Sequence, residues 1–300
     1  MRRGIVYAAL AYTLWGLLPL YWHALHDLPA LEILSHRIVW ALLVTLLLVT
    51  FRGGWAWLPT ALRSRRVMLV FVSSALLLTG NWFVYIWAVN AGYLIETSLG
   101  YFINPLVNVL LGVLFLRERL RTGQLAAILI ALAGVLYLTF QYGALPWIAL
   151  TLALSFGAYG LLRKTAALGS LEGLTLETLL LAVPALGFLL YQEASGVGSF
   201  GHASASTTLL LIGAGAVTSA PLLLFAAGAR RITLTTLGIL QYIAPTIQFT
   251  LGVLVFGEHL SAARLVGFCL IWFALAIYTV EGSLRASATA AAGRAAARGA

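Results

Sequence analysis

Charged side chains are scarce in this sequence of 300 residues. Lysine, arginine, aspartate and glutamate together make up 9% of the chain, against roughly 25% in soluble globular proteins. Hydrophobic residues account for 62%. A soluble fold needs polar groups to cover its surface, so this composition excludes a soluble enzyme, a secreted disulfide-rich domain and a disordered chain. The sequence therefore predicts a protein whose surface lies largely in lipid.

Cysteine and lysine each occur once. Cys269 lies in an apolar run without a second cysteine, so no intrachain disulfide or cysteine-based metal site forms, and we expect a buried apolar residue there. Lys164 lacks the glycine that precedes the lysine of a phosphate-binding Walker A loop, which argues against ATP hydrolysis by this chain. No catalytic constellation, metal site or cofactor motif stands out on any one element. We therefore expect no cofactor.

Apolar runs long enough to cross a bilayer recur ten times. A spanning helix needs about 20 mostly apolar residues. The runs cover residues 4–22, 31–51, 67–89, 92–116, 123–140, 146–162, 174–192, 207–228, 232–256 and 265–281. The sequence predicts an all-α integral membrane protein with ten transmembrane helices and no soluble domain.

The basic residues indicate how the chain is oriented. The net charge is +9, but the basic residues sit in short clusters between apolar runs, so nucleic-acid binding is not expected. With a cytoplasmic N-terminus, 16 of the 18 fall in cytoplasmic segments, as the positive-inside rule requires. We expect a multi-pass protein of a bacterial-type inner membrane, with both termini cytoplasmic and residues 283–300 as a mobile cytoplasmic tail.

The chain also repeats itself. Residues 105–120 align with residues 245–260 at an offset of 140 positions, sharing a proline, a Leu-Gly-Val-Leu run and a glutamate. The offset places five helices in each half, residues 1–141 and 142–282. Because five is odd, the second half crosses the membrane in the opposite sense. Such inverted repeats, meeting at a midplane site, are the architecture of secondary transporters.

Several segments resemble RarD-type transporters. They are residues 32–37 (EILSHR), 80–90, 98–106 (SLGYFINPL), 155–164 and 241–246. The resemblance covers nearly the whole chain, and the segment 98–106 is its most distinctive part. It implies a ten-helix inner-membrane permease of the EamA branch of the drug/metabolite transporter superfamily, usually regarded as an exporter of metabolites or drugs.

Polar groups at membrane depth are costly, so each is a candidate for a transport site. In the span 92–116, polar and small residues recur every four positions and share one helix face. They are Glu96, Gly100, Asn104, Asn108 and Gly112. In the span 232–256, Gly238, Gln241, Pro245, Gln248 and Gly252 recur at spacings of three and four. Both faces line a cavity between the repeats or, alternatively, pack closely with their amides bonded across the interface.

Two repeat-related prolines, Pro105 and Pro245, lie near mid-span. Each removes the helical hydrogen bond to the carbonyl four residues earlier, those of Tyr101 and Gln241. In hydrocarbon a freed carbonyl needs protein, water or ligand to satisfy it. The prolines are therefore candidates for a hinge and for substrate or cation contacts, with a passive kink as the alternative.

Ionisable and aromatic side chains complete the candidate site. Arg37 is expected to pair with Glu32 or Glu96, to reach the interface, or to bind an anionic group. Glu96 is the first candidate for a proton-carrying carboxylate, with structural pairing as the alternative. Deep aromatics stack on a planar substrate or simply pack. The expected cavity-lining residues are Glu32, Arg37, Trp40, Asn81, Trp82, Tyr85, Glu96, Tyr101, Asn104, Asn108, Tyr159, Glu177, Gln241, Tyr242 and Gln248, with Pro105 and Pro245 as hinges.

Two function classes remain. The first is a secondary-active transporter that exports small metabolites or drug-like molecules by alternating access, driven by protons or by exchange. The second is an integral-membrane enzyme or lipid-handling protein, which would gather its chemistry near one interface. The polar groups spread along mid-depth faces of both halves, so the pattern favours a transporter whose partners are a small-molecule substrate and the lipid bilayer.

Overall fold

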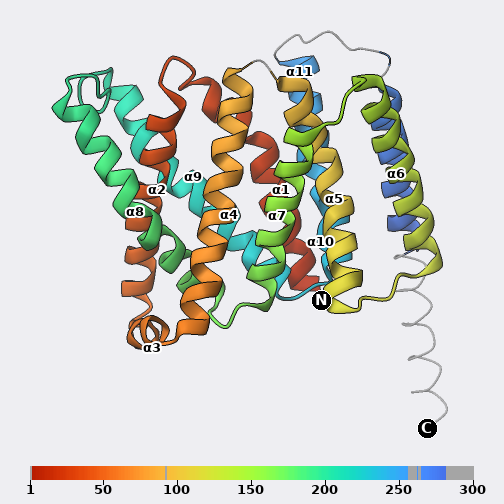
Figure 1. The fold of residues 1–300 in the computed structure, drawn as a ribbon, viewed down its shortest axis with the longest axis horizontal. Coiled ribbons are helices and arrows are strands. Elements are labelled where there is room, and N and C mark those ends of the chain that lie inside the picture. Colours follow the sequence, from red (N-terminus) through yellow and green to blue (C-terminus); the bar gives the residue numbers. More distant parts are fainter. Residues whose placement is uncertain (1, 92, 256–261, 263–264, 282–300) are drawn as a thin grey trace.

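The computed structural model describes residues 2–91, 93–255, 262 and 265–281, and these residues form α-helices and loops without a β-strand (Figure 1). The helices are α1 (Arg2–His23), α2 (Ala30–Phe51), α3 (Trp57–Arg63), α4 (Arg65–Asn90), α5 (Leu94–Leu116), α6 (Thr122–Tyr142), α7 (Trp147–Thr165), α8 (Ser170–Ala194), α9 (Ala205–Ala229), α10 (Leu234–Gln241) and α11 (Ile243–Leu254). A further apolar helix covers Leu265–Glu281. The prediction of an all-α protein is confirmed.

Eight segments are long and apolar enough to cross a membrane. They lie in α1, α2, α4, α5, α6, α8 and α9 and in the combined segment Leu234–Leu254. The other two expected spans do not meet the same criteria: α7 carries Arg163 and Lys164 in its last turn, and Leu265–Glu281 is shorter. The structure therefore supports a multi-span membrane protein, and the count of ten spans stays a prediction.

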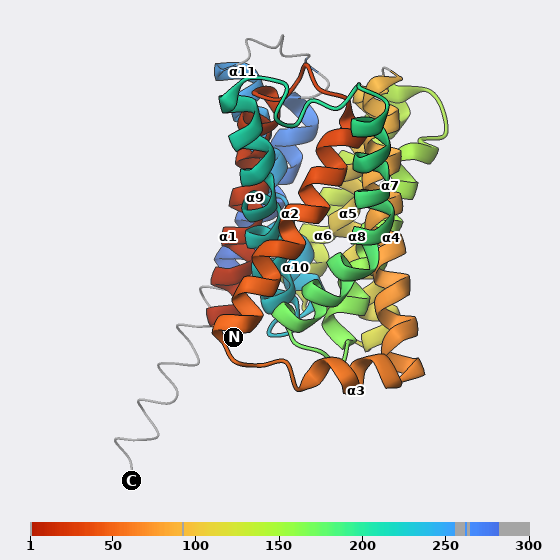
Figure 2. The same ribbon diagram turned by 90° about the vertical axis from the view of Figure 1, so that its left-hand side faces the viewer.

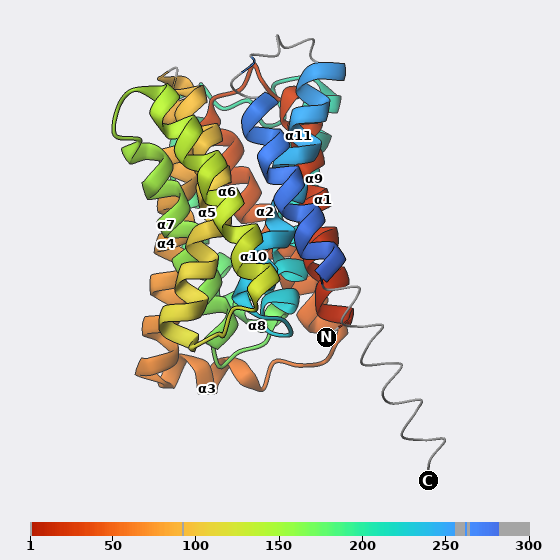
Figure 3. The same ribbon diagram turned by 90° about the vertical axis from the view of Figure 1, so that its right-hand side faces the viewer.

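The long helices lie side by side in one bundle (Figures 1, 2 and 3). The N-terminus, α3 and the loops that join α5 to α6 and α7 to α8 lie at one end, called here the N-terminal end. The loops that join α1 to α2 and α8 to α9 lie at the opposite end. The arginine-rich stretches 63–66 and 117–121 belong to elements of the N-terminal end, so the basic clusters gather on one side of the bundle.

The two halves of the sequence interleave within the bundle. First-half helix α5 packs against α7 and α10, α2 packs against α8 and α9, and α1 packs against α9 and α11. Small residues allow these close approaches: a Cβ placed on Gly238 would lie 2.6 Å from the carbonyl oxygen of Pro105, and one on Gly157 would lie 2.7 Å from Val107. The first half is thus packed chiefly on the second.

Two expectations are revised. The expected span over residues 232–256 is present as Leu234–Leu254, but it is divided at Tyr242, because α10 ends at Gln241 and α11 begins at Ile243. Pro245 has no N–H for the carbonyl of Gln241, and the amide of Tyr242 bonds instead to Ile239, three residues earlier, at 3.3 Å. Cys269, expected to be buried, is exposed on the outside of the bundle.

The repeat-related proline of the first half behaves differently. Pro105 lies inside α5, which continues without interruption from Leu94 to Leu116. Pro105 therefore lies in a continuous helix, whereas Pro245 follows the point where α10 ends and α11 begins.

Gly238→Ala should destabilise the bundle, because its methyl group would collide with the backbone of α5 at Pro105. Overpacking of this kind costs about 1–3 kcal/mol, so the thermal midpoint of the detergent-purified protein should fall by several degrees. Gly187→Ala in α8 is the matched control, since a Cβ there meets nothing within 4 Å. Equal midpoints for the two variants would contradict the close contact.

Candidate functional site

A cavity of about 700 Å³ lies between the two halves of the chain. Small-molecule sites typically enclose about 300–1,000 Å³. The walls come from α1, α2, α4 and α5 of the first half and from α7, α9, α10 and α11 of the second. The cavity includes Trp22 and His23 at the end of α1 and Thr97 in the first turn of α5, so it reaches toward the end opposite the N-terminal end.

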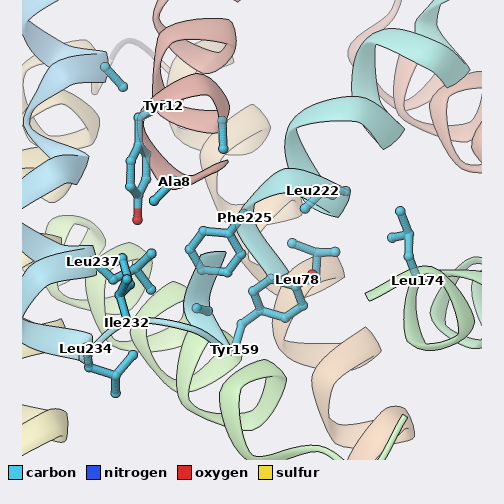
Figure 4. Close-up of a cluster of buried hydrophobic side chains, with 13 residues drawn as sticks. Ala8, Tyr12, Leu78, Tyr159, Leu174, Leu222, Phe225, Ile232, Leu234 and Leu237 are labelled. Carbon is cyan, nitrogen blue, oxygen red and sulfur yellow. The ribbon is translucent and has the colours of Figure 1, made fainter. Parts of the chain in front are cut away.

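Closely packed side chains separate the cavity from the N-terminal end. Tyr12 and Leu222 line the cavity and also belong to a buried cluster with Tyr159, Phe225 and Leu237. The rings of Tyr159 and Phe225 lie against each other (Figure 4), with centroids 5.9 Å apart and planes inclined by 12°. These five residues, called here the floor, close the cavity from below.

Below the floor, Glu118 joins the two halves. Its carboxylate accepts hydrogen bonds from the amides of Leu234 and Thr235 at 2.6 and 2.9 Å and from the Thr235 hydroxyl at 2.8 Å. A carboxylate at a helix N-terminus satisfies orphan amides and opposes the positive end of the helix dipole. Arg117, with a left-handed φ of 54°, turns the chain at the end of α5 so that Glu118 reaches the start of α10.

Two basic residues reinforce the same end. Lys164 Nζ donates to the carbonyl of Ala229 at 3.0 Å and to that of Ile232. Arg230 Nη1 donates to the carbonyl of Ala166 at 2.7 Å. Cations satisfy the unpaired carbonyls at helix C-termini. The end of α7 is therefore tied to the end of α9.

Arg37 carries the positive charge of the cavity wall. Its guanidinium carbon lies 4.6 Å from the ring centroid of Trp22 on α1 and 4.5 Å from that of Trp82 on α4. Its Nε donates to the hydroxyl of Thr218 on α9 at 3.1 Å. Cation–π contacts are worth about 2 kcal/mol or more where water is excluded. Three helices other than its own therefore hold this side chain in position.

Neither carboxylate expected to pair with Arg37 does so. Glu32, only 1% exposed, accepts from the amide and hydroxyl of Ser199 at 2.7 and 3.1 Å. Glu96 accepts from the amide of Ile148 in the first turn of α7 at 2.8 Å. Both carboxylates accept hydrogen bonds from backbone amides of the second half. The sequence alone could not predict these partners, because they lie far away along the chain.

Three amides form a network at the contact of α5 with α10. Asn108 is fully buried, and its Nδ2 donates to Asn104 Oδ1 at 3.2 Å and to Gln241 Oε1 at 2.8 Å. Asn104 and Gln241 line the cavity. Because Asn108 occupies their oxygens, their amide nitrogens are left as hydrogen-bond donors for the cavity.

Aromatic rings form much of the remaining wall. Trp15 and Phe156 meet edge to face with centroids 5.6 Å apart, and Tyr85 and Tyr101 do so at 6.0 Å. All four line the cavity. Aromatic faces and edges of this kind suit a planar apolar body, which they contact with little loss of side-chain freedom.

The structure brings together many of the residues expected at the site. Those that line the cavity are Arg37, Asn81, Trp82, Tyr85, Tyr101, Asn104, Gln241, Pro245 and Gln248. Those placed outside its lining are Glu32, Trp40, Glu96, Pro105, Asn108, Tyr159, Glu177 and Tyr242.

Packing explains several of the residues outside the lining. The backbone and Cβ of Trp40 lie against α9, where a Cβ on Gly215 would come within 2.3 Å of them, and the Trp40 ring centroid lies 5.9 Å from that of Phe200. Tyr159 belongs to the floor. Tyr242 is buried and donates to the carbonyl of Phe102 at 3.2 Å. These aromatic side chains join helices instead of facing the cavity.

Glu177 forms a separate buried pair. Its carboxylate lies 3.6 Å from Nη1 of Arg163 and accepts a hydrogen bond from Ser74. Both charged side chains are at most 1% exposed. A buried ion pair of this kind is costly to break, because either partner alone would be an uncompensated charge.

Several cavity residues were missed from the sequence. Tyr12, Trp15, Pro19 and Trp22 follow one another along a single face of α1 at spacings of three and four, so this helical period was a usable signal. Thr218 lies in an apolar run without any distinguishing pattern.

Comparison with known proteins places the chain among transporters. A model of the EamA-like transporter family matches residues 2–140. The transporter YojE of Bacillus subtilis (strain 168) is 48% identical over 282 residues, which cover 93% of this chain and 94% of that protein. The RarD protein of Escherichia coli (strain K12) is 43% identical over 280 residues, covering 93% and 95%.

One solved structure has the same fold. A protein crystal structure matches with a TM-score of 0.71 at 22% identity, covering 92% of this chain and 98% of the other. This similarity supports the helical architecture alone.

Three leucine-to-cysteine variants in a Cys269→Ser background test the cavity. Leu18 lines it, Leu237 lies fully buried in the floor, and Leu114 is exposed on the outside of α5. Thiol modification requires the thiolate and therefore water. A small water-soluble methanethiosulfonate should label Leu18→Cys rapidly and the other two slowly, as measured by intact-protein mass. Equal rates for Leu18→Cys and Leu237→Cys would show that no water-filled cavity exists there.

Proposed function

Because the chain belongs to the EamA-like transporter family and has RarD proteins among its relatives, we propose that it is a secondary-active transporter of small metabolites or drug-like molecules. It works by alternating access about the cavity between its two halves. The observation that carries the proposal is the cavity itself, whose walls come from both halves and whose N-terminal side is closed by the floor and by Glu118. Export across the inner membrane is the expected direction.

The conformation supports alternating access in a ten-span inverted repeat. Residues 1–141 and 142–282 form the two repeats, and repeat-related prolines lie in a continuous helix, α5, and in a broken one, α10–α11. In an inverted repeat, exchange of the two conformations exchanges the side from which the site is reached. Pro105 and Pro245 are the hinges in this scheme.

The charge distribution supports an outward-facing state. By the positive-inside rule, the end that carries the arginine clusters faces the cytoplasm. The N-terminus then lies inside the cell, and the cavity reaches toward the outer face of a bacterial-type inner membrane. Coupling to a proton gradient or to a counter-transported solute supplies the driving force.

Transport in liposomes is the direct test. Metabolites that accumulate in cells lacking the protein, relative to cells that have it, define a panel of solutes. The purified protein in liposomes should transport at least one of these solutes when a pH gradient or a gradient of a counter-transported solute is imposed across the membrane. If no solute moves and a modified lipid appears instead, the protein is a membrane enzyme or lipid-handling protein.

Gln241→Leu should abolish this transport while leaving insertion and expression intact. The change removes the partner of Asn108 at the α5–α10 contact and a hydrogen-bond donor of the cavity wall. Initial rates in liposomes with equal protein content measure the effect. Gln141→Leu, an exposed position of α6, is the matched control and should transport normally. Normal transport by Gln241→Leu would show that this face only packs.

Glu118→Gln should favour opening on the N-terminal side. Loss of the charged cap of α10 costs about 1–2 kcal/mol, equivalent to a population shift of about 5–30-fold. Leu237→Cys, protected by the floor, should then be labelled several-fold faster in the Glu118→Gln background than in the parent. Glu193→Gln, an exposed carboxylate at the opposite end, is the control. Unchanged labelling would show that Glu118 does not hold the closed side.

A further inference from the structure

Arg37 is a half-buried cation at membrane depth, and no carboxylate of the described part of the chain pairs with it. It lies about two helical turns into α2 and faces the cavity. Among the residues that the structure describes, no carboxylate lies within ion-pair distance of its guanidinium, and its Nε donates to the Thr218 hydroxyl at 3.1 Å. Arginine stays protonated in proteins. The cavity therefore contains a fixed positive charge whose terminal N–H groups remain for a ligand.

The contacts of Arg37 preserve its charge for this use. Trp22 and Trp82 hold the guanidinium through their ring faces, and Thr218 occupies Nε. Ring faces stabilise a cation without neutralising it. With Nε engaged, the two terminal nitrogens are the groups left to bind a carboxylate in the bidentate geometry that arginine favours.

The rest of the cavity wall also favours a ligand with a negative charge. Among the residues that the structure describes, no aspartate or glutamate lines the cavity. The buried carboxylates around it are used elsewhere, Glu32 by Ser199, Glu96 by Ile148 and Glu177 by Arg163 and Ser74. The amide nitrogens of Asn104 and Gln241 add donors, because Asn108 occupies both amide oxygens.

The aromatic side chains of the cavity favour a ring in the part of the ligand that does not contact Arg37. Trp15 and Phe156 form one edge-to-face pair and Tyr85 and Tyr101 another, and all four line the cavity with Arg37. A planar ring would exchange water for these apolar faces. The ligand therefore needs an aromatic body attached to its anionic group.

We infer that the cavity binds an aromatic organic acid, with its carboxylate on the terminal nitrogens of Arg37 and its ring against the aromatic wall. This substrate class rests on the proposed transport function. A cation is disfavoured by the charge of Arg37, and a zwitterion is disfavoured because none of the described lining residues is a carboxylate that could meet its ammonium group.

Three compounds of nearly equal shape separate these cases. They are 3-phenylpropanoate, an anion; phenylalanine, a zwitterion; and 2-phenylethylamine, a cation. Quenching of tryptophan fluorescence in the detergent-purified protein reports binding, since Trp15, Trp22 and Trp82 line the cavity. The anion should bind at least tenfold more tightly than the zwitterion and more tightly still than the cation. An equal or reversed order overturns the inference.

Substitution of Arg37 assigns the preference to one residue. Arg37→Gln should weaken binding of 3-phenylpropanoate by about 10–100-fold, as expected for a lost hydrogen bond to a charged group. Binding of neutral 3-phenylpropanol should change less than threefold, which shows that the cavity is still folded. Arg37→Lys should restore part of the affinity, because it keeps the charge but loses the bidentate geometry. Arg66→Gln, an exposed arginine of α4, is the control and should bind as the parent does.

Binding and transport together distinguish two kinds of failure. If the protein transports a neutral or cationic solute and Arg37→Gln leaves binding unchanged, the transporter function holds and the anion site is wrong. If 3-phenylpropanoate binds through Arg37 but no solute crosses liposomes, the site holds and the transporter function fails. Loss of binding of both the acid and the alcohol in Arg37→Gln, with an unchanged thermal midpoint, overturns the assignment of the carboxylate to Arg37.

Discussion

A carboxylate buried in a membrane protein needs a hydrogen-bond donor, and this requirement holds the two halves of the bundle together. Glu32, Glu96 and Glu118 of the first half each accept from a backbone amide of the second half. Glu177 of the second half accepts from Ser74 of the first. The acidic side chains thus act as cross-links between segments far apart in sequence. The cavity lies among these cross-links, and none of its lining residues in the described part of the chain is acidic.

The acidic groups and Arg37 differ in their partners, and this difference leaves a positive charge in the cavity wall. Every one of these carboxylates has a donor from the opposite half, whereas the terminal nitrogens of Arg37 have no such partner among the described residues. The protein holds this cation with aromatic faces, which fix its position and leave its charge in place. One strongly directional group in an otherwise aromatic and amide-lined space is enough to orient a small ligand.

Hydropathy located the long helices, because long apolar runs have few alternatives in lipid, but it did not predict the short helix α3. The break between α10 and α11 was not foreseen: Pro245 alone does not distinguish a kink from an interruption, and Pro105 in α5 shows the other outcome. The spacing of the amide side chains indicated Asn104 and Gln241 as cavity residues. It could not distinguish them from Asn108, which is fully buried behind them and bonds to both. The partners of Glu32 and Glu96 lay out of reach, since they are backbone amides more than fifty positions away.

The cross-links also bear on how the chain is made. A ribosome delivers the first half to the membrane before the second half exists, so Glu32, Glu96 and Glu118 enter without their donors. Each then depends on water or lipid headgroups until Ser199, Ile148 and Leu234 arrive. Leu234, at the start of α10, is the last of these to be synthesised. The hydrogen bonds of the first half are therefore completed only after the start of α10 has been synthesised.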